Sequence, residues 1–300
     1  MNKIVEINQV ADYNKYVGAD TLHPLVSVID FSKLPPIRYV DTCKLYGFYA
    51  IYLRGAKFSD LKYGESTYDY QEDSLVFVAP GQVMGSEADG QYHQVNGYIL
   101  AFHPDLLRGT VLENRMKDYS YFSYSVSEAL YPSAEEKDIV IKCFQNIYHE
   151  LLHRDEQSDM LIVDYIRLLL DFCVRFYDRQ FTTRQAENND IFTHFQQVIG
   201  DYLCSSLPVD QGLPSVQYCA DQLCLSANYL SDLIKKETGI SALKHIHRKI
   251  FEMACKQLHE TDKSVSEIAT TLGFQYSQHF SRWFKKQCGC TPGEYRIIHQ

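Results

Sequence analysis

The sequence has no long hydrophobic run. Its most apolar stretches, such as the one containing Leu168–Leu170, are interrupted by Asp or Arg within a few residues, whereas a membrane-spanning helix needs ~20 consecutive apolar residues. The first residues, MNKIVEINQVADYNKY, also lack the apolar segment of a secretory signal peptide. We therefore expect a cytoplasmic protein with no membrane partner.

The sequence also lacks recognisable cysteine motifs and catalytic motifs. The nine Cys include no C-x-x-C pair, and the closest are Cys288 with Cys290 and Cys219 with Cys224. Disulfide frameworks and zinc fingers need a more regular spacing, so we expect reduced thiols and predict no metal or other cofactor. Because no P-loop, G-x-G-x-x-G motif or Ser/His/Asp grouping occurs, we do not expect an enzyme.

Acidic side chains predominate, but unevenly. Residues 1–213 carry 30 acidic and 18 basic side chains, a net charge of −12, whereas residues 214–300 carry 8 acidic and 11 basic side chains, a net charge of +3. An acidic surface repels DNA, so the first part of the chain is suited to another task. Any contact with nucleic acid is expected at the C-terminal end.

The first part is predicted to combine strands and then helices. A β unit is expected over about 20–105, because short apolar runs alternate with turn-rich segments, as in a sandwich or small barrel. The runs are Leu25–Ile29, Phe48–Leu53, Leu75–Val78 and Tyr98–Phe102.

Two helices are predicted between about 133 and 180. Ser133 and Glu136 have the spacing of a capping box, and apolar residues follow at helical intervals. The second helix, Ser158–Arg179, is apolar on more than one face and must be buried on more than one face. One of these faces could meet a second subunit, so we expect a homodimer formed through residues 133–179.

The domain boundary is predicted in the polar segment Thr182–Asp190. This gives a regulatory and dimerisation domain, residues 1–182, and a second domain, residues 190–300, that starts with a helix over Ile191–Leu203. The segment Ser205–Pro214 contains two Pro and a Gly, which is typical of a loop.

Beyond Pro214 the sequence repeats itself. Ser215–Leu225 matches Ser264–Phe274, and Asn228–Gly239 matches Gln278–Gly289. The first pair is offset by 49 residues and the second by 50, so one residue has been added in the turn of the second copy. Each copy predicts a helix-turn-helix.

Several residues of the repeat are predicted to have structural roles. Small residues in the two first helices allow close packing, and glycines end the second helices. The turn between the helices often needs a positive φ, which suits Gly better than Cys. These residues are Ala220 and Ala269, Gly239 and Gly289, and, in the turns, Cys224 and Gly273. Ser226 and Ser277 are the expected N-caps. A helix over Ala242–His259 would join the copies with a buried stripe of Leu243, Ile246, Ile250, Met253, Ala254 and Leu258.

Two second helices of this kind could enter successive major grooves of double-stranded DNA, about 34 Å apart. The base-reading candidates are the polar residues near the start of each helix, because such side chains can pair with base edges: Asn228, Ser231, Asp232, Gln278, His279, Ser281 and Arg282. The phosphate-binding candidates are the lysines further along, which would set affinity and salt dependence: Lys235, Lys236, Lys285 and Lys286.

These motifs resemble those of the AraC/XylS family of bacterial transcription regulators. The segment FSRWFKKQCGCTPGEYR, with Pro292 near its end, is similar to the family's second helix-turn-helix, and LSANYLSDLIKKETG is similar to its first recognition helix. The resemblance implies an all-α DNA-binding domain of seven helices, and an N-terminal cupin-like β-barrel followed by dimerising helices. The segment Tyr68–Gln82 resembles part of that barrel. The expected partners are DNA, a second copy, RNA polymerase and an unidentified small-molecule effector.

One residue departs from the family pattern. Asp232 stands where many members have Arg in the first recognition helix, and an acidic group cannot hold phosphate or guanine. Residues 226–239 have no net charge, whereas residues 277–290 have a net charge of +3 and no acidic residue. We therefore expect the second copy to dominate electrostatic attachment to DNA.

A metal- or ligand-binding β-barrel protein with an accessory helical repeat is the alternative. His149, Glu150 and His153 form an H-E-x-x-H, which on a helix could bind zinc. No third ligand follows at a suitable spacing, and Leu151 and Leu152 belong to an apolar stripe. A cupin metal centre would need an H-x-H within the β unit, but the sequence's H-x-H, His245 with His247, lies on a predicted helix.

Overall fold

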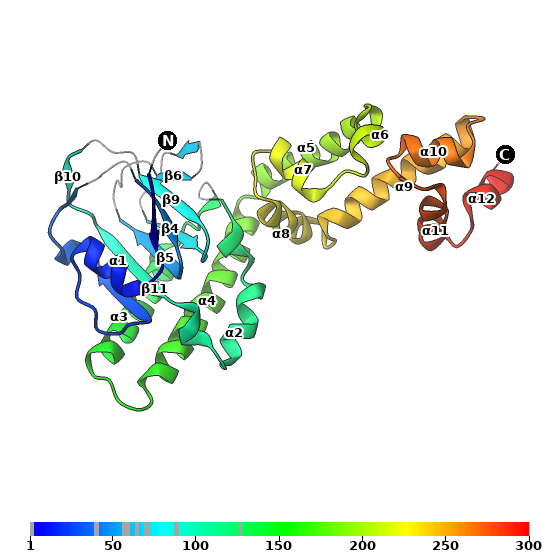
Figure 1. The fold of residues 1–300 in the computed structure, drawn as a ribbon. Helices are drawn as coiled ribbons and strands as arrows, with labels where there is room; N and C mark the ends of the chain where they lie inside the picture. Colours follow the sequence, from blue (N-terminus) through cyan, green and yellow to red (C-terminus); the bar gives the residue numbers. More distant parts are fainter. Residues whose placement is uncertain are drawn as a thin grey trace. The chain divides into compact units, whose positions relative to one another are not determined.

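The chain folds into two compact units, residues 1–183 and 184–300, shown in the computed structural model of Figure 1. The structure describes residues 3–38, 42–55, 61–63, 66–68, 73–86, 90–125 and 128–299. The first unit combines β-sheets with helices, and the second is helical throughout its described residues. The predicted α+β class with an all-α C-terminal part is therefore confirmed.

One sheet of the first unit contains the four strands that the sequence predicted. In order across the sheet they are β2 (Val26–Asp30), β11 (Gly97–Phe102), β5 (Tyr49–Arg54) and β8 (Ser74–Val78). All neighbouring pairs are antiparallel. Every residue of β8 is buried, because this sheet is covered on both faces.

The other strands were not predicted. A five-stranded sheet has the order β1 (Lys3–Ile7), β4 (Thr42–Tyr46), β9 (Val83–Ser86), β6 (Leu61–Tyr63) and β7 (Ser66–Tyr68), with β1 parallel to β4. A two-stranded sheet pairs β3 (Ile37–Arg38) with β10 (Tyr92–His93).

The β unit therefore begins well before residue 20, and that predicted limit was wrong. β1 is an edge strand whose Ile4 is 57% exposed, so its apolar pattern is weak. Helix α1 (Val10–Val17) follows it. Within the described ranges the strands form separate sheets and no closed barrel. Of the segment Tyr68–Gln82, residues 69–72 lie outside the described part.

The main core of this unit lies between the two larger sheets. Tyr46 and Met84 reach it from the five-stranded sheet, Ala50 and Ile99 from the four-stranded sheet, and Val10 from α1. The opposite face of the four-stranded sheet packs on aromatic side chains and on two long helices, as the contacts of Phe77 with Tyr177 and of Tyr98 with Phe144 show. Burial of these apolar faces is the main stabilising contribution.

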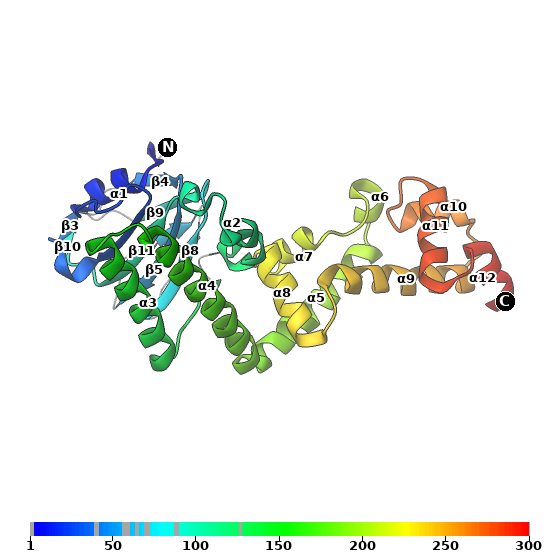
Figure 2. The same cartoon turned by 90° about the horizontal axis from the view of Figure 1, so that it is seen from below.

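Helices α3 (Ala134–Leu152) and α4 (Ser158–Thr183) pack against each other and lie side by side in Figures 1 and 2. The predicted capping box of Ser133 and Glu136 is confirmed. Glu136 also receives two hydrogen bonds from Arg179 of α4, with N···O distances of 2.9 and 2.7 Å. This bidentate pair fixes α4 to the start of α3.

Short elements complete the first unit. They are α2 (Val111–Arg115) and four 3-10 turns, Phe31–Lys33, Pro104–Leu107, Met116–Asp118 and Ser120–Ser123.

The second unit has eight described helices, one more than predicted. They are α5 (Gln185–Cys204), α6 (Leu207–Gln211), α7 (Val216–Gln222), α8 (Ala227–Thr238), α9 (Ala242–Glu260), α10 (Val265–Thr271), α11 (Ser277–Cys288) and α12 (Pro292–His299).

Two predicted irregular segments are helical. The additional helix, α6, lies in the predicted loop Ser205–Pro214, because Pro208 sits in a first turn, where Pro is tolerated. The predicted linker Thr182–Asp190 was also wrong, since Arg184 alone separates α4 from α5. Asn188 in that segment is buried and donates a hydrogen bond to Glu237 of α8 over 3.0 Å.

Helix α9 runs through the second unit, and α8 and α11 lie near different parts of it (Figures 1 and 2). Its buried residues recur every four positions: Ala242, Ile246, Ile250, Ala254 and Leu258. Leu243, which we expected in this stripe, is 50% exposed, because it lies one position away from the buried line. None of the described helices is long and apolar enough to cross a lipid bilayer.

We predict that Gly273→Ala lowers the free energy of unfolding by about 2–4 kcal/mol. Gly273 has a φ of 92°, and an added Cβ would lie 2.6 Å from the backbone of Gly212. Urea denaturation measures the loss.

Substitutions at two other glycines serve as controls that separate backbone strain from steric collision with Gly212. Gly239→Ala meets only the backbone strain, since φ is 74° and no atom lies within 4 Å, and should cost about 1 kcal/mol. Gly200→Ala in α5 has neither problem and should stabilise by about 0.5–1 kcal/mol. Equal losses at Gly273 and Gly239 would contradict the close approach to Gly212.

Candidate nucleic-acid interface

Both copies of the repeat fold as a helix, a tight turn and a second helix. α7 and α8 form the first copy, and α10 and α11 form the second copy. Ala220 and Ala269 are fully buried in the two first helices. Both turn residues expected to have positive φ do so, Cys224 at 56° and Gly273 at 92°.

The second helices begin at equivalent places in the repeat. Ser226 is the N-cap of α8, and its hydroxyl accepts a hydrogen bond from the Tyr229 amide. The prediction that Ser277 caps α11 was wrong, because Tyr276 holds that position and makes no side-chain capping bond. Tyr276 lies 50 residues after Ser226, so the start of the helix follows the offset of the repeat.

Each second helix buries one face and exposes another. α8 buries aliphatic side chains, including Leu230 and Leu233. α11 buries Phe280 and Phe284 in an aromatic cluster, and the Phe284 ring centroid lies 5.0 Å from that of Phe251 in α9. Gly239 and Gly289 end the helices in the left-handed conformation. Neither second helix is therefore wholly buried.

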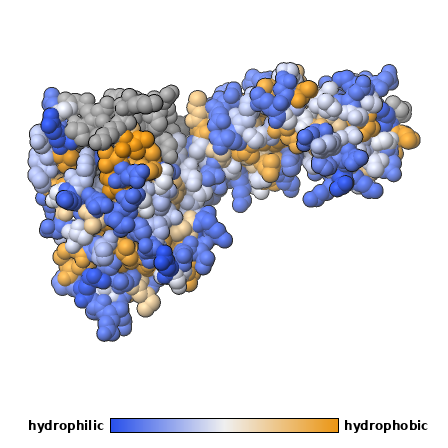
Figure 3. All heavy atoms as spheres, in the orientation of Figure 1, coloured by the Kyte–Doolittle hydropathy of each residue, from blue (hydrophilic) through white to orange (hydrophobic). Residues whose placement is uncertain are grey.

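The structure places most of the predicted contact residues at the surface. The exposed ones are Asn228, Gln278, His279, Arg282 and the four lysines Lys235, Lys236, Lys285 and Lys286. Ser231, Asp232 and Ser281 are half-buried. The Ser231 hydroxyl donates to the Ala227 carbonyl over 2.7 Å, so its proton is already used within α8. In the view of Figure 3, hydrophilic residues predominate over the second unit.

In the second copy, four of the predicted residues line one shallow depression: Gln278, Ser281, Arg282 and Lys285. They follow one another at intervals of three, one and three positions, which places them on one face of α11. His279 and Lys286 do not line it. The depression therefore brings together the ammonium group of Lys285, the guanidinium group of Arg282 and the uncharged polar groups of Gln278 and Ser281.

The sequence analysis missed the other walls of this depression. They come from the starts of α10 and α12 and include Ser264, Ser266 and Thr291. Two capping boxes could have indicated these starts. Ser264 pairs with Glu267, and Thr291 exchanges hydrogen bonds of 2.7 and 3.3 Å with Glu294. Hydrogen bonds from Ser264 and from Thr291 lower the pKa of Glu267 and Glu294 respectively, so both carboxylates stay ionised.

Tyr295 and Arg296, the last two residues of the segment FSRWFKKQCGCTPGEYR, hold α12 in place. Arg296 donates to the carbonyls of Leu258 and Lys263 over 3.1 and 2.6 Å. The Tyr295 ring lies 5.4 Å from the Phe284 ring. The hydrogen bonds of Arg296 satisfy carbonyls at and beyond the end of α9. The contact of Tyr295 with Phe284 supports the buried face of α11.

The H-E-x-x-H segment does not have the geometry of a zinc site. The rings of His149 and His153 stack with centroids 4.4 Å apart, and His153 lies beyond the end of α3. Glu150 accepts a hydrogen bond from Ser158 over 3.2 Å. Across the described ranges, no three His, Cys, Asp or Glu side chains are grouped to hold a metal ion.

Comparisons with known proteins identify the repeat. A family model described as a helix-turn-helix domain matches residues 219–297, which include α8 and α11. The chain is 46% identical over 77 residues to the uncharacterised regulator YtdP of Bacillus subtilis, covering 26% of this chain and 10% of that protein. It is 28% identical over 155 residues to the melibiose operon regulatory protein of Escherichia coli, covering 50% of this chain and 51% of that protein. It is 33% identical over 100 residues to the arabinose operon regulatory protein of Escherichia coli, covering 33% of this chain and 32% of that protein.

Residues 219–297 therefore form a helix-turn-helix domain of the type found in these AraC-type regulators of transcription. The chain spans between a tenth and about half of the length of these relatives. The matched region contains α8 and α11, the two second helices that present polar side chains to solvent.

We predict that Arg282→Ala weakens DNA binding by about 1–3 kcal/mol, the usual cost of losing an Arg contact to guanine. Asp232→Ala, at the equivalent place in α8, should change the affinity less, because an acidic group does not attract DNA. Fluorescence anisotropy with a labelled site measures both, with Arg248→Ala in α9 as the matched control. The reverse ranking of Arg282 and Asp232 would contradict the assignment.

Proposed function

We propose that the protein is a sequence-specific DNA-binding regulator of transcription, with α8 and α11 entering successive major grooves. The observation that carries this proposal is the pair of helix-turn-helix units attached to a single helix, α9, each with a polar exposed face. α9 has 19 residues and is therefore about 28 Å long, close to the ~34 Å of one DNA turn.

The two helices have different roles in this proposal. α11 supplies the electrostatic attachment, with Lys285 and Lys286 at phosphates and Arg282 and Gln278 at base edges. α8 carries no net charge over residues 226–239, so its contribution is to discriminate between sequences through Asn228 rather than to raise affinity in general.

Salt titration tests the function. We expect the full chain to bind a DNA site, selected from a random pool, with an affinity that falls steeply with salt. The Lys285→Gln, Lys286→Gln double variant should reduce the slope of log affinity against log salt by about 1.8, since each phosphate contact contributes about 0.9. Lys142→Gln, an exposed residue of α3, is the control. A slope near zero for the unaltered chain would exclude the proposal.

The first unit is proposed to be a cupin-like domain that senses a small molecule. Two sheets packed around a shared aromatic and aliphatic core support this assignment. A cytoplasmic location and RNA polymerase as a further partner fit the same role.

Dimerisation through α3 and α4 is the remaining part of the proposal. Leu161 and Leu168 of α4 are 41% and 46% exposed. Tyr165, which lies between these two leucines in the sequence, and Phe172, which follows them, are half-buried. Spacings of four, three and four residues place all four on one helical stripe. An apolar stripe of this kind is suited to a matching stripe on a second copy.

We predict a dimer at micromolar concentration in sedimentation velocity, which Leu168→Asp converts to a monomer, because a buried unpaired carboxylate is costly. Val111→Asp is the matched control, since Val111 is 70% exposed but lies on α2, outside the stripe. A monomeric profile of the unaltered protein would rule out the dimer.

A further inference from the structure

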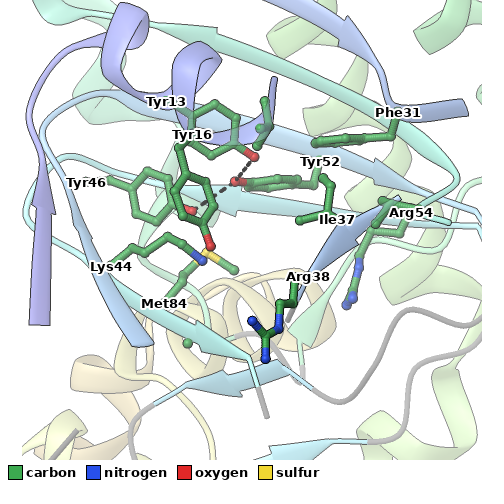
Figure 4. Close-up of a pocket in the computed structure, with 13 residues that line it drawn as sticks. Tyr13, Tyr16, Phe31, Ile37, Arg38, Lys44, Tyr46, Tyr52, Arg54 and Met84 are labelled. Carbon is green, nitrogen blue, oxygen red and sulfur yellow. Dashed lines mark hydrogen bonds between the residues drawn. The ribbon is translucent and has the colours of Figure 1, made fainter. Parts of the chain in front are cut away.

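A cavity of about 90 Å³ opens in the first unit, between α1 and strands of the sheets. Figure 4 shows Lys44 and Met84 on one side of it, and Ile37, Arg38 and Arg54 on the other. The strands that supply these residues are β4, β9, β3 and β5, so the cavity exists only when the sheets have assembled.

Part of its wall is a row of tyrosine hydroxyls. The Tyr52 hydroxyl donates to the Tyr13 hydroxyl over 3.1 Å, and it lies 3.1 Å from the Tyr46 hydroxyl (Figure 4). Burial raises the pKa of both Tyr46 and Tyr52 well above the usual value. These phenols are therefore neutral. Because Tyr52 donates its proton to Tyr13, Tyr46 is the donor to Tyr52, and the oxygens of Tyr46 and Tyr52 can accept a hydrogen bond from a hydroxyl group of a ligand.

The charged part of the wall is entirely cationic among the described residues. Arg38, Lys44 and Arg54 line the cavity, and none of the described lining residues is Asp or Glu. The half-buried Lys44 places its Nζ 4.6 Å from the ring centroid of Tyr16. Arg38 donates from Nε to the Gly90 carbonyl over 3.1 Å, and no described carboxylate forms an ion pair with Arg38 or Lys44.

This concentration of positive charge opposes the charge of its surroundings. Residues 1–183 carry 26 Asp and Glu against 17 Lys and Arg. Three cations around one cavity in an acidic unit favour an anion, because guanidinium and ammonium groups bind carboxylate or phosphate by charge-assisted hydrogen bonds.

The volume limits the size of the ligand. One water needs about 10–15 Å³ by this measure, so 90 Å³ accommodates roughly six to nine non-hydrogen atoms. Apolar side chains, including Val17, Phe31 and Val95, make up the remaining wall. A molecule of this size with one anionic group and an otherwise apolar or hydroxylated body is a small organic acid.

We propose that this cavity binds a small organic carboxylate, with Arg38 and Lys44 at the carboxylate and the tyrosine hydroxyls at the body of the molecule. The regulatory consequence of binding rests on the ligand-sensing role proposed above, whereas the binding itself does not. Arg54 contributes to the positive potential of the cavity from its place on β5.

Isothermal titration calorimetry of the full chain, without DNA, tests the binding. The probes are hexanoate and benzoate, each beside its neutral amide, and inorganic phosphate. We expect at least one carboxylate to bind, and its amide to bind at least tenfold more weakly, because a hydrogen bond to a charged group contributes about 1.5–3 kcal/mol.

Arg38→Gln and Lys44→Gln should each weaken carboxylate binding about tenfold. Lys15→Gln is the matched control, since Lys15 is exposed on the same helix as Tyr13 and does not line the cavity. Circular dichroism establishes that each variant is folded. An amide that binds as tightly as its acid, phosphate that binds more tightly than either acid, or no binding by any probe at millimolar concentration would overturn the proposal.

Anisotropy with labelled DNA then separates this proposal from the function. If the carboxylate binds and the chain does not bind DNA, the proposed function fails and the site stands. If DNA binds and no carboxylate does, the site fails and the proposed function stands.

Discussion

Both helix-turn-helix units depend on one apolar stripe of α9. The stripe recurs every four residues from Ala242 to Leu258, and each of its members is at most 1% exposed. The first copy joins α9 near its start, where the Thr238 hydroxyl lies 2.8 Å from His245 Nε2. The second joins it through the Phe251 ring and, at the far end, through Arg296. Short helices are marginal on their own, so the stripe gives both repeats their stability and fixes the spacing between them.

The repeat is symmetric in backbone but not in side chains. The first copy buries aliphatic residues and carries Asp232 near the start of α8, whereas the second buries aromatic rings and carries Arg282 at the equivalent place in α11. Contacts with phosphate raise affinity for every sequence alike. In the proposed function the second copy supplies most of the electrostatic attachment, because Lys235 and Lys236 of the first copy are balanced by Asp232 and Glu237. The first copy then contributes mainly to discrimination between sequences.

How much of the fold could be predicted from the sequence depends on how completely each strand is buried. The four predicted strands all belong to the four-stranded sheet, whose two covered faces produce continuous apolar runs, as in β8. The five-stranded sheet escaped prediction because its strands are short or exposed, as Ile4 illustrates. In the second unit the repeat located α8 and α11 directly. It could not show that Ser264 and Thr291 lie beside Arg282, because tertiary packing alone brings those three together.

The cationic cavity was beyond sequence reasoning for the same reason, since Arg38, Lys44 and Arg54 come from three different strands. The charge of the proposed ligand is a small change for this unit. One further negative charge hardly alters a unit that already carries 26 acidic side chains. A bound anion changes DNA affinity only if it binds one conformation or oligomeric state more tightly than another. The elements around the cavity, α1 and β3 among them, are therefore where such a difference must arise.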